Sequence, residues 1–250
     1  MKAIILNATA WMIVPVMDAI AKHLSLTMDV FQITWARYFF TVVFTLSLMV
    51  LFYRETLVWS KRPKLQLVRG IILAFSTLCF FYSISVISLP KALTLAFVAP
   101  ITCTALSPFF LGEKVGIRRW SAVLVGFVGV LIVSRPGTIH FTMSYLGLFV
   151  SAFLIAINIA LVRKFSKNHS SISFTFYAFL SAAIINGLLA MNNYMIMTFN
   201  DTMILVLCGI ICGVGGNFLT MASKNLESSV FAPIQSVSYT HLTLPTILLV

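Results

Sequence analysis

The stretch RGIILAFSTLCFFYSISVISLPKALTLAFVAPITCTALSPFFLGEK, residues 69–114, contains two long apolar runs separated by a short Leu-Pro-Lys turn. Each run has about 20 residues, the length of a helix that crosses the hydrocarbon core of a bilayer. Similar runs precede and follow this stretch, so the sequence predicts about nine membrane spans. They are expected at residues 3–22, 30–52, 67–88, 91–111, 118–134, 144–162, 172–191, 202–222 and from about 229.

The composition of the whole chain agrees with this pattern. Of the 250 residues, 60% are hydrophobic and only 9% are charged, and the mean hydropathy is +1.03. Such a chain has too few polar residues to cover the surface of a water-soluble domain. The sequence therefore predicts an all-α membrane protein, a polytopic helical bundle whose main surroundings are the lipid bilayer.

The cationic residues collect in alternate loops. The net charge of +11 would suggest nucleic acid as a partner of a soluble protein, but short basic loops next to spans set membrane topology instead, so we expect no nucleic-acid binding. The counts favour an inner (plasma) membrane protein with a cytoplasmic N-terminus. Thirteen cations are expected on the cytoplasmic side: Lys2, Arg54, Lys61, Arg62, Lys64, Arg69, Lys114, Arg118, Arg119, Arg163, Lys164, Lys167 and Lys224, against Lys22, Arg37, Lys91 and Arg135 elsewhere.

A series of short motifs follows in order along residues 69–137. They are Arg69-Gly70, Phe80-Phe81-Tyr82, Ser88-Leu89-Pro90-Lys91-Ala92, Phe97-Val98-Ala99-Pro100, Leu111-Gly112-Glu113-Lys114, Arg119-Trp120, Gly126-Phe127-Val128-Gly129-Val130 and Arg135-Pro136-Gly137. This series resembles the first EamA repeat of the drug/metabolite transporter superfamily. The resemblance implies ten helices in two inverted five-helix repeats, and a protein that moves small metabolites through the inner membrane, commonly outward.

A faint internal repeat points the same way. Gly70-Ile71-Ile72 and Gly209-Ile210-Ile211 open the third and eighth predicted spans, 139 residues apart. Five spans separate them, so the two copies would have opposite orientations, as in many secondary transporters. We therefore expect a first EamA-like repeat of five helices at residues 1–137 and a second, incomplete one at residues 144–235.

The last fifteen or so residues depart from the family pattern. The segment 236–250 is polar and broken by Pro245, whereas the resemblance implies a full ninth helix and a tenth. We expect this segment to be non-native sequence at the end of a truncated gene. The alternative is a natural nine-helix variant.

No catalytic arrangement is visible in the sequence, which therefore predicts that the protein is not an enzyme. The six acidic residues and four histidines form no hydrolase triad, phosphate loop or metalloprotease motif. All four cysteines lie in apolar runs without metal-type spacing, so neither a metal nor any cofactor is expected.

Asp18 and Arg37 are the most informative polar residues. Each lies inside a predicted span, at depths that differ by only about 5 Å, so the two side chains can meet. A charge at such a depth costs roughly 2.5–3.5 kcal/mol on insertion scales unless it is paired or hydrated. One interpretation is that they line a water-filled cavity and bind substrate or a proton. The other is a purely structural pair between two helices.

Further cavity candidates are aromatic, cationic and amide side chains. Trp11 and Tyr82 offer aromatic rings for cation–π contact, and Asn158 is a mid-span amide that can bond a substrate or a neighbouring helix. Lys91 follows the third predicted span and is either a cation at the mouth of the cavity or a solvated loop charge.

Three prolines interrupt predicted spans. Pro15 lies in the first span, and Pro100 and Pro108 lie in the fourth. Proline removes a backbone donor and kinks a helix, which frees carbonyl groups. These positions are candidate hinges for alternating access, or static kinks.

Together these features predict a secondary transporter for a small organic metabolite, amphipathic or zwitterionic, that works by alternating access and exports its substrate. A proton as coupling ion and a homodimer are open alternatives. One rival interpretation is a multidrug or toxic-cation exporter, which predicts broad competition by unrelated cations. Another is a non-transporting membrane scaffold, which predicts no flux and no stabilisation by ligands.

Overall fold

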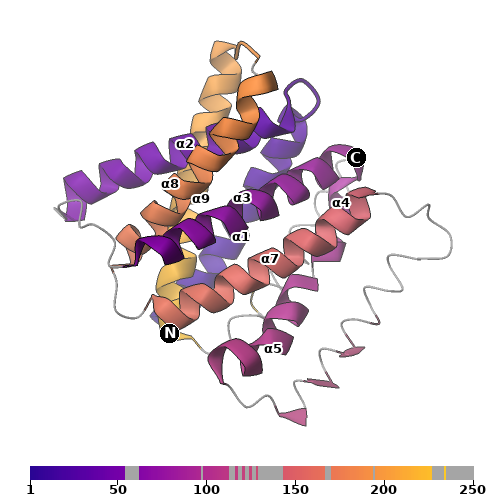
Figure 1. Ribbon diagram of the computed structural model, residues 1–250, viewed down its shortest axis with the longest axis vertical. Coiled ribbons are helices and arrows are strands. Elements are labelled where there is room, and N and C mark those ends of the chain that lie inside the picture. Colours follow the sequence, from indigo (N-terminus) through magenta and orange to yellow (C-terminus); the bar gives the residue numbers. More distant parts are fainter. Residues whose placement is uncertain are drawn as a thin grey trace.

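The computed structural model describes residues 1–53, 62–96, 98–112, 116–117, 120–121, 124–125, 128, 143–166, 170–193, 195–226 and 234. The regular structure in these ranges is helical (Figure 1). The main helices are α1 (Lys2–Leu24), α2 (Val30–Leu48), α3 (Pro63–Val86), α4 (Leu89–Ala96), α5 (Val98–Leu111), α7 (Met143–Phe165), α8 (Ser171–Ala190) and α9 (Phe199–Asn225). A π-helical turn, Met49–Tyr53, extends α2, and a 3-10 turn, Met191–Asn193, follows α8.

Six of the described helices are long and apolar enough to cross a membrane: α1, α2 with part of its extension, α3, α7, α8 and α9. The predicted span at residues 91–111 is covered by two described helices, α4 and α5, on either side of Phe97, which lies outside the described residues, so this span stays a prediction. Most of the predicted fifth span (118–134), the ninth span and the segment 236–250 lie outside the described residues. The chain is therefore a multi-pass membrane protein, and the count of nine spans stays a prediction.

The start of α3 corrects one sequence-based assignment. The charge count places Arg69 with the loop cations, but Arg69 lies inside α3 and is only 2% exposed. The helix begins at Pro63, and proline is well suited to a first helical turn because its missing N–H is not needed there. Arg69 is consequently almost two turns inside the helix rather than at its edge.

Two of the helix starts show side-chain caps. Asp29 precedes α2 and its carboxylate accepts a hydrogen bond from the Phe31 N–H at 2.8 Å. Thr198 precedes α9, where its hydroxyl oxygen accepts from the Asp201 N–H at 3.2 Å and donates to the Asp201 carboxylate at 2.6 Å. Such caps satisfy N–H groups that have no partner inside the helix.

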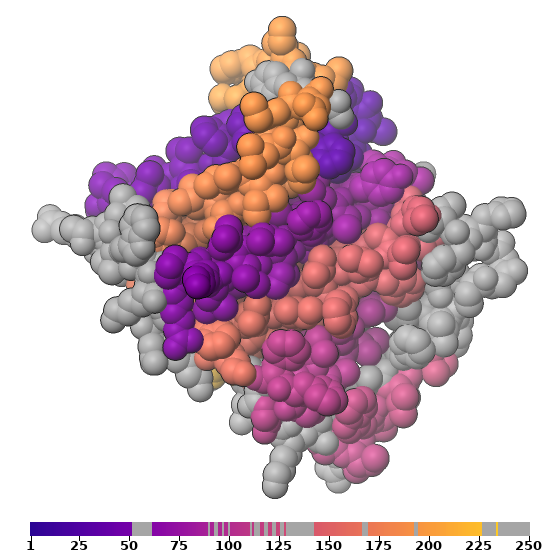
Figure 2. All heavy atoms as spheres, in the orientation of Figure 1, coloured from indigo at the N-terminus to yellow at the C-terminus, as the bar shows by residue number. Residues whose placement is uncertain are grey.

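The helices pack in a regular pairing. Helix α3 packs against α7 and α8, helix α9 packs against α1 and α2, and α2 packs against α8. Figure 2 shows α8, α3 and α7 as neighbouring diagonal bands on one face of the molecule. These pairings bring the N-terminal helices α1–α3 against the later helices α7–α9, and a cavity lies between the two groups.

Two glycines allow the closest of these contacts. A Cβ on Gly70 would overlap the Cβ of Ser181 on α8, and a Cβ on Gly209 would overlap the Cβ of Phe40 on α2. Small residues let helix backbones approach closely in membranes, where the hydrophobic effect does not drive helix association. Both copies of the Gly-Ile-Ile tripeptide therefore begin at a close contact between the N-terminal and the later helices.

The three prolines occupy different places. Pro15 lies inside α1 and is buried, and Pro108 lies inside α5. Pro100 lies in α5, three residues after Phe97, which is outside the described residues. The hinge role of all three stays a prediction.

Candidate functional site: a charged cavity between the helices

A cavity of about 210 Å³ lies between α1–α3 and α7–α9. Much of its wall is apolar, including the rings of Trp11, Phe80, Phe81 and Phe179. The same wall contains one acidic side chain, Asp18, and two cationic ones, Arg37 and Arg69. Each of the three is at most 5% exposed. A cavity of this kind in the core of a helical membrane protein can hold a small charged molecule away from lipid.

One group of polar residues joins the first three helices. We name Asp18, Arg37, Tyr38 and Thr77 the Arg37 cluster. Arg37 Nη2 donates to Thr77 Oγ1 at 2.9 Å, and Nη1 points at the Met17 sulfur at 3.3 Å. The Tyr38 hydroxyl lies 2.6 Å from Thr77 Oγ1, and the guanidinium stacks 4.3 Å from the centre of the Tyr38 ring.

The charges of the Arg37 cluster are incompletely paired. Asp18 and Arg37 interact electrostatically, but within the described part of the chain no hydrogen bond or ion pair joins them. Arg37 Nε is buried without a hydrogen-bond partner, and a thioether sulfur is a weak acceptor for Nη1. Both side chains therefore retain capacity to bind another molecule in the cavity.

A second group lies toward the start of α3 and the end of α7. We name Gln66, Arg69, Asn158 and Phe174 the Arg69 cluster. Arg69 Nε donates to Asn158 Oδ1 at 3.2 Å, and Nη1 donates to Gln66 Oε1 and to the Phe174 carbonyl, both at 2.9 Å. The guanidinium lies 4.1 Å from the centre of the Phe174 ring. All three acceptors are neutral.

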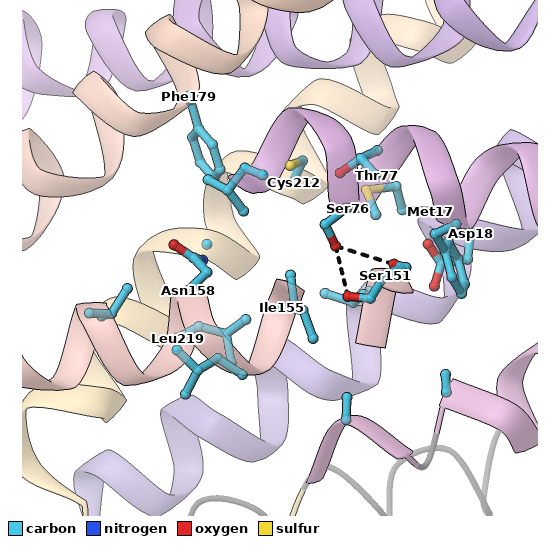
Figure 3. A pocket seen from close by; sticks show the side chains of 18 of the residues that line it. Met17, Asp18, Ser76, Thr77, Ser151, Ile155, Asn158, Phe179, Cys212 and Leu219 are labelled. Atoms are coloured by element: carbon cyan, nitrogen blue, oxygen red, sulfur yellow. Dashed lines mark hydrogen bonds between the residues drawn. The ribbon is translucent and has the colours of Figure 1, made fainter. Parts of the chain in front are cut away.

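Hydroxyl pairs complete the polar wall. Ser76 on α3 bonds Ser151 on α7, with 3.1 Å to its carbonyl and 3.2 Å to its hydroxyl. Figure 3 shows this pair in the middle of the cavity, with Asn158 on one side and Asp18 on the other. Thr175 on α8 and Thr220 on α9 also form a pair, at 2.8 Å. The two clusters therefore occupy opposite parts of one cavity.

The structure brings four of the six cavity candidates together. Trp11, Asp18, Arg37 and Asn158 all line the cavity. Tyr82, which is 52% exposed, and Lys91, also exposed, are absent from the described residues of the lining.

Lys22, one turn after Asp18, does not compete for its carboxylate. Its ammonium group donates instead to the carbonyls of Ser85 and Ile87, at 3.1 and 3.4 Å.

Sequence reasoning missed Arg69, Thr77 and Gln66. A signal for Arg69 exists, because Pro63 at the start of the helix places Arg69 well inside it. For Thr77 no signal exists, because most hydroxyl groups in spans bond their own helix, as Thr34 does here. The described residues contain no group of three or more metal-ligating side chains, and all four cysteines are free thiols.

The fold and the cavity define the class: a multi-pass membrane protein with a cavity that contains charged side chains between two groups of helices, an arrangement found in carriers of small molecules. The chain belongs to the EamA-like transporter family, whose model matches residues 1–135 and 142–243. The family and the relatives below are transporters, not enzymes, as the sequence predicts.

Several curated proteins are similar to this chain. The S-adenosylmethionine uptake transporter of Rickettsia bellii is 28% identical, over 77% of this chain and 66% of that protein. The S-adenosylmethionine uptake transporter of Rickettsia prowazekii is 24% identical, over 91% of this chain and 79% of that protein. The pseudopaline exporter CntI of Pseudomonas aeruginosa is 27% identical, over 87% of this chain and 76% of that protein. The chain matches just under two thirds of the length of the Rickettsia bellii protein.

A solved crystal structure shares the fold. It superimposes with a TM-score of 0.73 at 15% sequence identity and covers 98% of this chain and 89% of its own. Its likeness at this identity concerns the fold alone.

Proposed function

We propose that this chain is an inner-membrane secondary transporter of a small zwitterionic metabolite and that the charged cavity is its binding site. One observation carries the proposal: two buried guanidinium groups and one buried carboxylate face the same cavity. Ionised groups at membrane depth are costly, so they persist mainly where they face water, a partner or a substrate. A molecule that carries both signs of charge complements such a cavity.

The chemistry of the lining fits an amino-acid-like head group. Guanidinium binds carboxylate through paired, charge-assisted hydrogen bonds, and Asp18 offers an anion to an ammonium or sulfonium group. The rings of Trp11, Phe80 and Phe81 provide aromatic faces for a cation or a planar ring. S-adenosylmethionine, the substrate in the names of the rickettsial relatives, combines a carboxylate, an ammonium, a sulfonium and a planar base.

Alternating access is supported by the pairing of the helices. If α1–α3 correspond to α7–α9, the contact of α1 with α9 corresponds to that of α7 with α3. In the same way, the contact of α2 with α9 corresponds to that of α8 with α3. Gly70 and Gly209 lie at equivalent contacts in this scheme. We propose that the two halves are inverted repeats that rock about these contacts around the cavity.

Direction, orientation and coupling are separate parts of the proposal. The sequence predicts export and a cytoplasmic N-terminus, and the relatives include an uptake transporter and an exporter by name. Asp18 makes a proton the candidate coupling ion. An imposed pH gradient of either sign, applied to oriented vesicles loaded with substrate, tests both the direction and the coupling.

The experiment is counterflow in proteoliposomes that contain the full chain. Vesicles are loaded with unlabelled S-adenosylmethionine, methionine or other zwitterions, and the entry of labelled S-adenosylmethionine or methionine is followed. We expect accumulation driven by zwitterions and no effect of simple cations such as tetraphenylphosphonium. Competition by unrelated cations would instead favour the multidrug exporter. Absence of flux and of ligand stabilisation across the panel would favour the scaffold and overturn the proposal.

A further inference from the structure

We propose that Arg69 is a second carboxylate-binding group, which holds the anionic end of the substrate at the opposite part of the cavity from the Arg37 cluster. This inference rests on the proposed function, because it assumes that the cavity binds a substrate. It narrows the substrate class to metabolites that carry a free carboxylate. It also divides their passage into two binding steps.

The first argument is the charge of Arg69. Within the described residues it has no carboxylate partner, since its three acceptors are the Asn158 and Gln66 amides and the Phe174 carbonyl. A buried cation that is hydrogen-bonded only to neutral groups keeps an uncompensated charge. Asp18 offsets one positive charge at Arg37, so the described lining retains an excess cation at Arg69. A bound carboxylate would supply the missing countercharge.

The second argument is the geometry of the guanidinium. Nε and Nη1 make the three hydrogen bonds of this guanidinium, while Nη2 donates to no acceptor in the described part of the chain. The side chain nevertheless lines the cavity. A carboxylate can approach Nη2 directly and replace the Asn158 amide oxygen at Nε, which gives the bidentate geometry that arginine forms best.

The third argument is the separation of the two cations. Thr77, which binds Arg37, and Arg69 are eight residues apart on α3, which corresponds to about 12 Å along the helix axis. Asn158 and Asp18 also lie on opposite sides of the cavity (Figure 3). We therefore infer that a single carboxylate binds one guanidinium group at a time and passes from one to the other.

Arg69 also links the two groups of helices. It lies on α3, and its acceptors Asn158 and Phe174 lie on α7 and α8. A carboxylate that replaces Asn158 at Nε removes a hydrogen bond between the halves at the moment of binding. Occupation of this site would thus weaken a contact that closes this part of the cavity, which connects substrate binding to opening.

The test compares acids with their esters. The purified 250-residue chain in nanodiscs is titrated with S-adenosylmethionine and with methionine, and then with the carboxyl methyl ester of each, which keeps the cation and removes the anion. We expect the wild type to prefer the acids by about tenfold to a hundredfold, the range for hydrogen bonds between charged groups. Arg69→Gln should reduce this acid-to-ester preference at least about tenfold.

Two further variants control for structure. Arg62→Gln removes an exposed cation from the start of the same helix and should leave the preference unchanged. Arg69→Lys keeps the positive charge but lacks the planar guanidinium that binds a carboxylate through two hydrogen bonds, so it should retain part of the preference. This variant replaces Arg69→Gln in the test if the Gln variant does not fold. If Arg69 has only a structural role, its substitution should weaken the binding of acid and ester equally.

The outcomes separate the two proposals. Counterflow of zwitterions with an acid preference that Arg69→Gln and Arg69→Lys leave intact overturns the role of Arg69 alone. A wild type that does not prefer the acids to the esters also overturns it. Loss of preference in Arg69→Gln, in a protein that shows no counterflow, supports the binding group and refutes transport.

Discussion

The Arg37 cluster and the Arg69 cluster each contain a buried arginine that lines the same cavity, but the surroundings of the two guanidinium groups differ. Arg37 has a carboxylate nearby, Asp18, together with a hydroxyl, a sulfur and an unpartnered Nε. Arg69 has three good hydrogen bonds, all to neutral oxygens. One cluster is thus balanced in charge but poor in hydrogen bonds, and the other is rich in hydrogen bonds but unbalanced in charge.

This difference separates two ways of keeping arginine in a membrane protein. Hydrogen bonds to neutral groups replace the water lost from a guanidinium, but they leave its charge uncompensated. A nearby carboxylate compensates the charge but leaves donors available when it forms no direct bond. We expect the Arg37 cluster to recognise both charges of a zwitterion and the Arg69 cluster to recognise the anion only.

The largest effect is expected from removing the carboxylate of the Arg37 cluster. Asp18→Asn makes this cluster resemble the Arg69 cluster, with a cation among neutral groups. If Asp18 binds substrate or a proton, transport should fall to background, because a neutral amide neither attracts a cation nor carries a proton. The measurement is counterflow at matched amounts of protein in the membrane.

The matched control is Asp201→Asn, which changes an acid at the cap of α9 outside the cavity. It should cost only about 1 kcal/mol of stability through the weakened cap and leave transport intact. Normal transport by Asp18→Asn would show that Asp18 is a structural residue.

The converse change gives the Arg69 cluster its missing anion. Asn158→Asp places a carboxylate where Arg69 Nε now bonds an amide oxygen at 3.2 Å. An internal carboxylate would compete with the substrate, so we expect carboxylate binding to weaken roughly thirtyfold, as for a strong charge-assisted pair. Titration with S-adenosylmethionine measures this loss, and the methyl ester should be affected much less. Equal losses for acid and ester would argue against an anion site at Arg69.

The sequence predicts the helices better than it predicts their faces. The expected span 144–162 is observed as α7 from Met143 to Phe165, because a continuous apolar run of that length has no other stable form in a bilayer. By contrast, Phe81 is buried while its neighbour Tyr82 is 52% exposed. Lipid and protein interior both accept aromatic rings, so composition does not show which of two adjacent residues faces the cavity.

The site was predictable only where a residue is rare in a span. Asp18 and Arg37 stand out because charge inside an apolar run is costly. Arg69 carries the same signal, but the predicted span began too late to show its depth. Thr77 has no signal, since its role depends on which residues of α2 face α3, and that is a property of packing.

A smaller effect is expected from the hydroxyl that supports Arg37. Thr77→Val keeps the shape of the side chain and removes the acceptor for Arg37 Nη2 and one of the two partners of the Tyr38 hydroxyl, the other being the Leu73 carbonyl. Loss of one hydrogen bond to a charged group costs about 1.5–3 kcal/mol, so we expect the transport KM to rise about tenfold. Thr34→Val is the control, because the Thr34 hydroxyl bonds only backbone carbonyls of its own helix. If both variants raise KM equally, the position of the hydroxyl is irrelevant.

The smallest effect is expected between the clusters. Ser76→Ala removes the hydroxyl that joins α3 to Ser151 on α7, at the middle of the cavity. This bond is between neutral groups and contributes about 0.5–1.5 kcal/mol, and alanine is well tolerated in a helix. We expect a change in KM of about threefold and the same change for acid and ester, because no charge is involved. A selective loss of acid binding in Ser76→Ala would mean that the carboxylate rests at the serine pair on its way between Arg37 and Arg69. The cavity would then contain three anion positions instead of two.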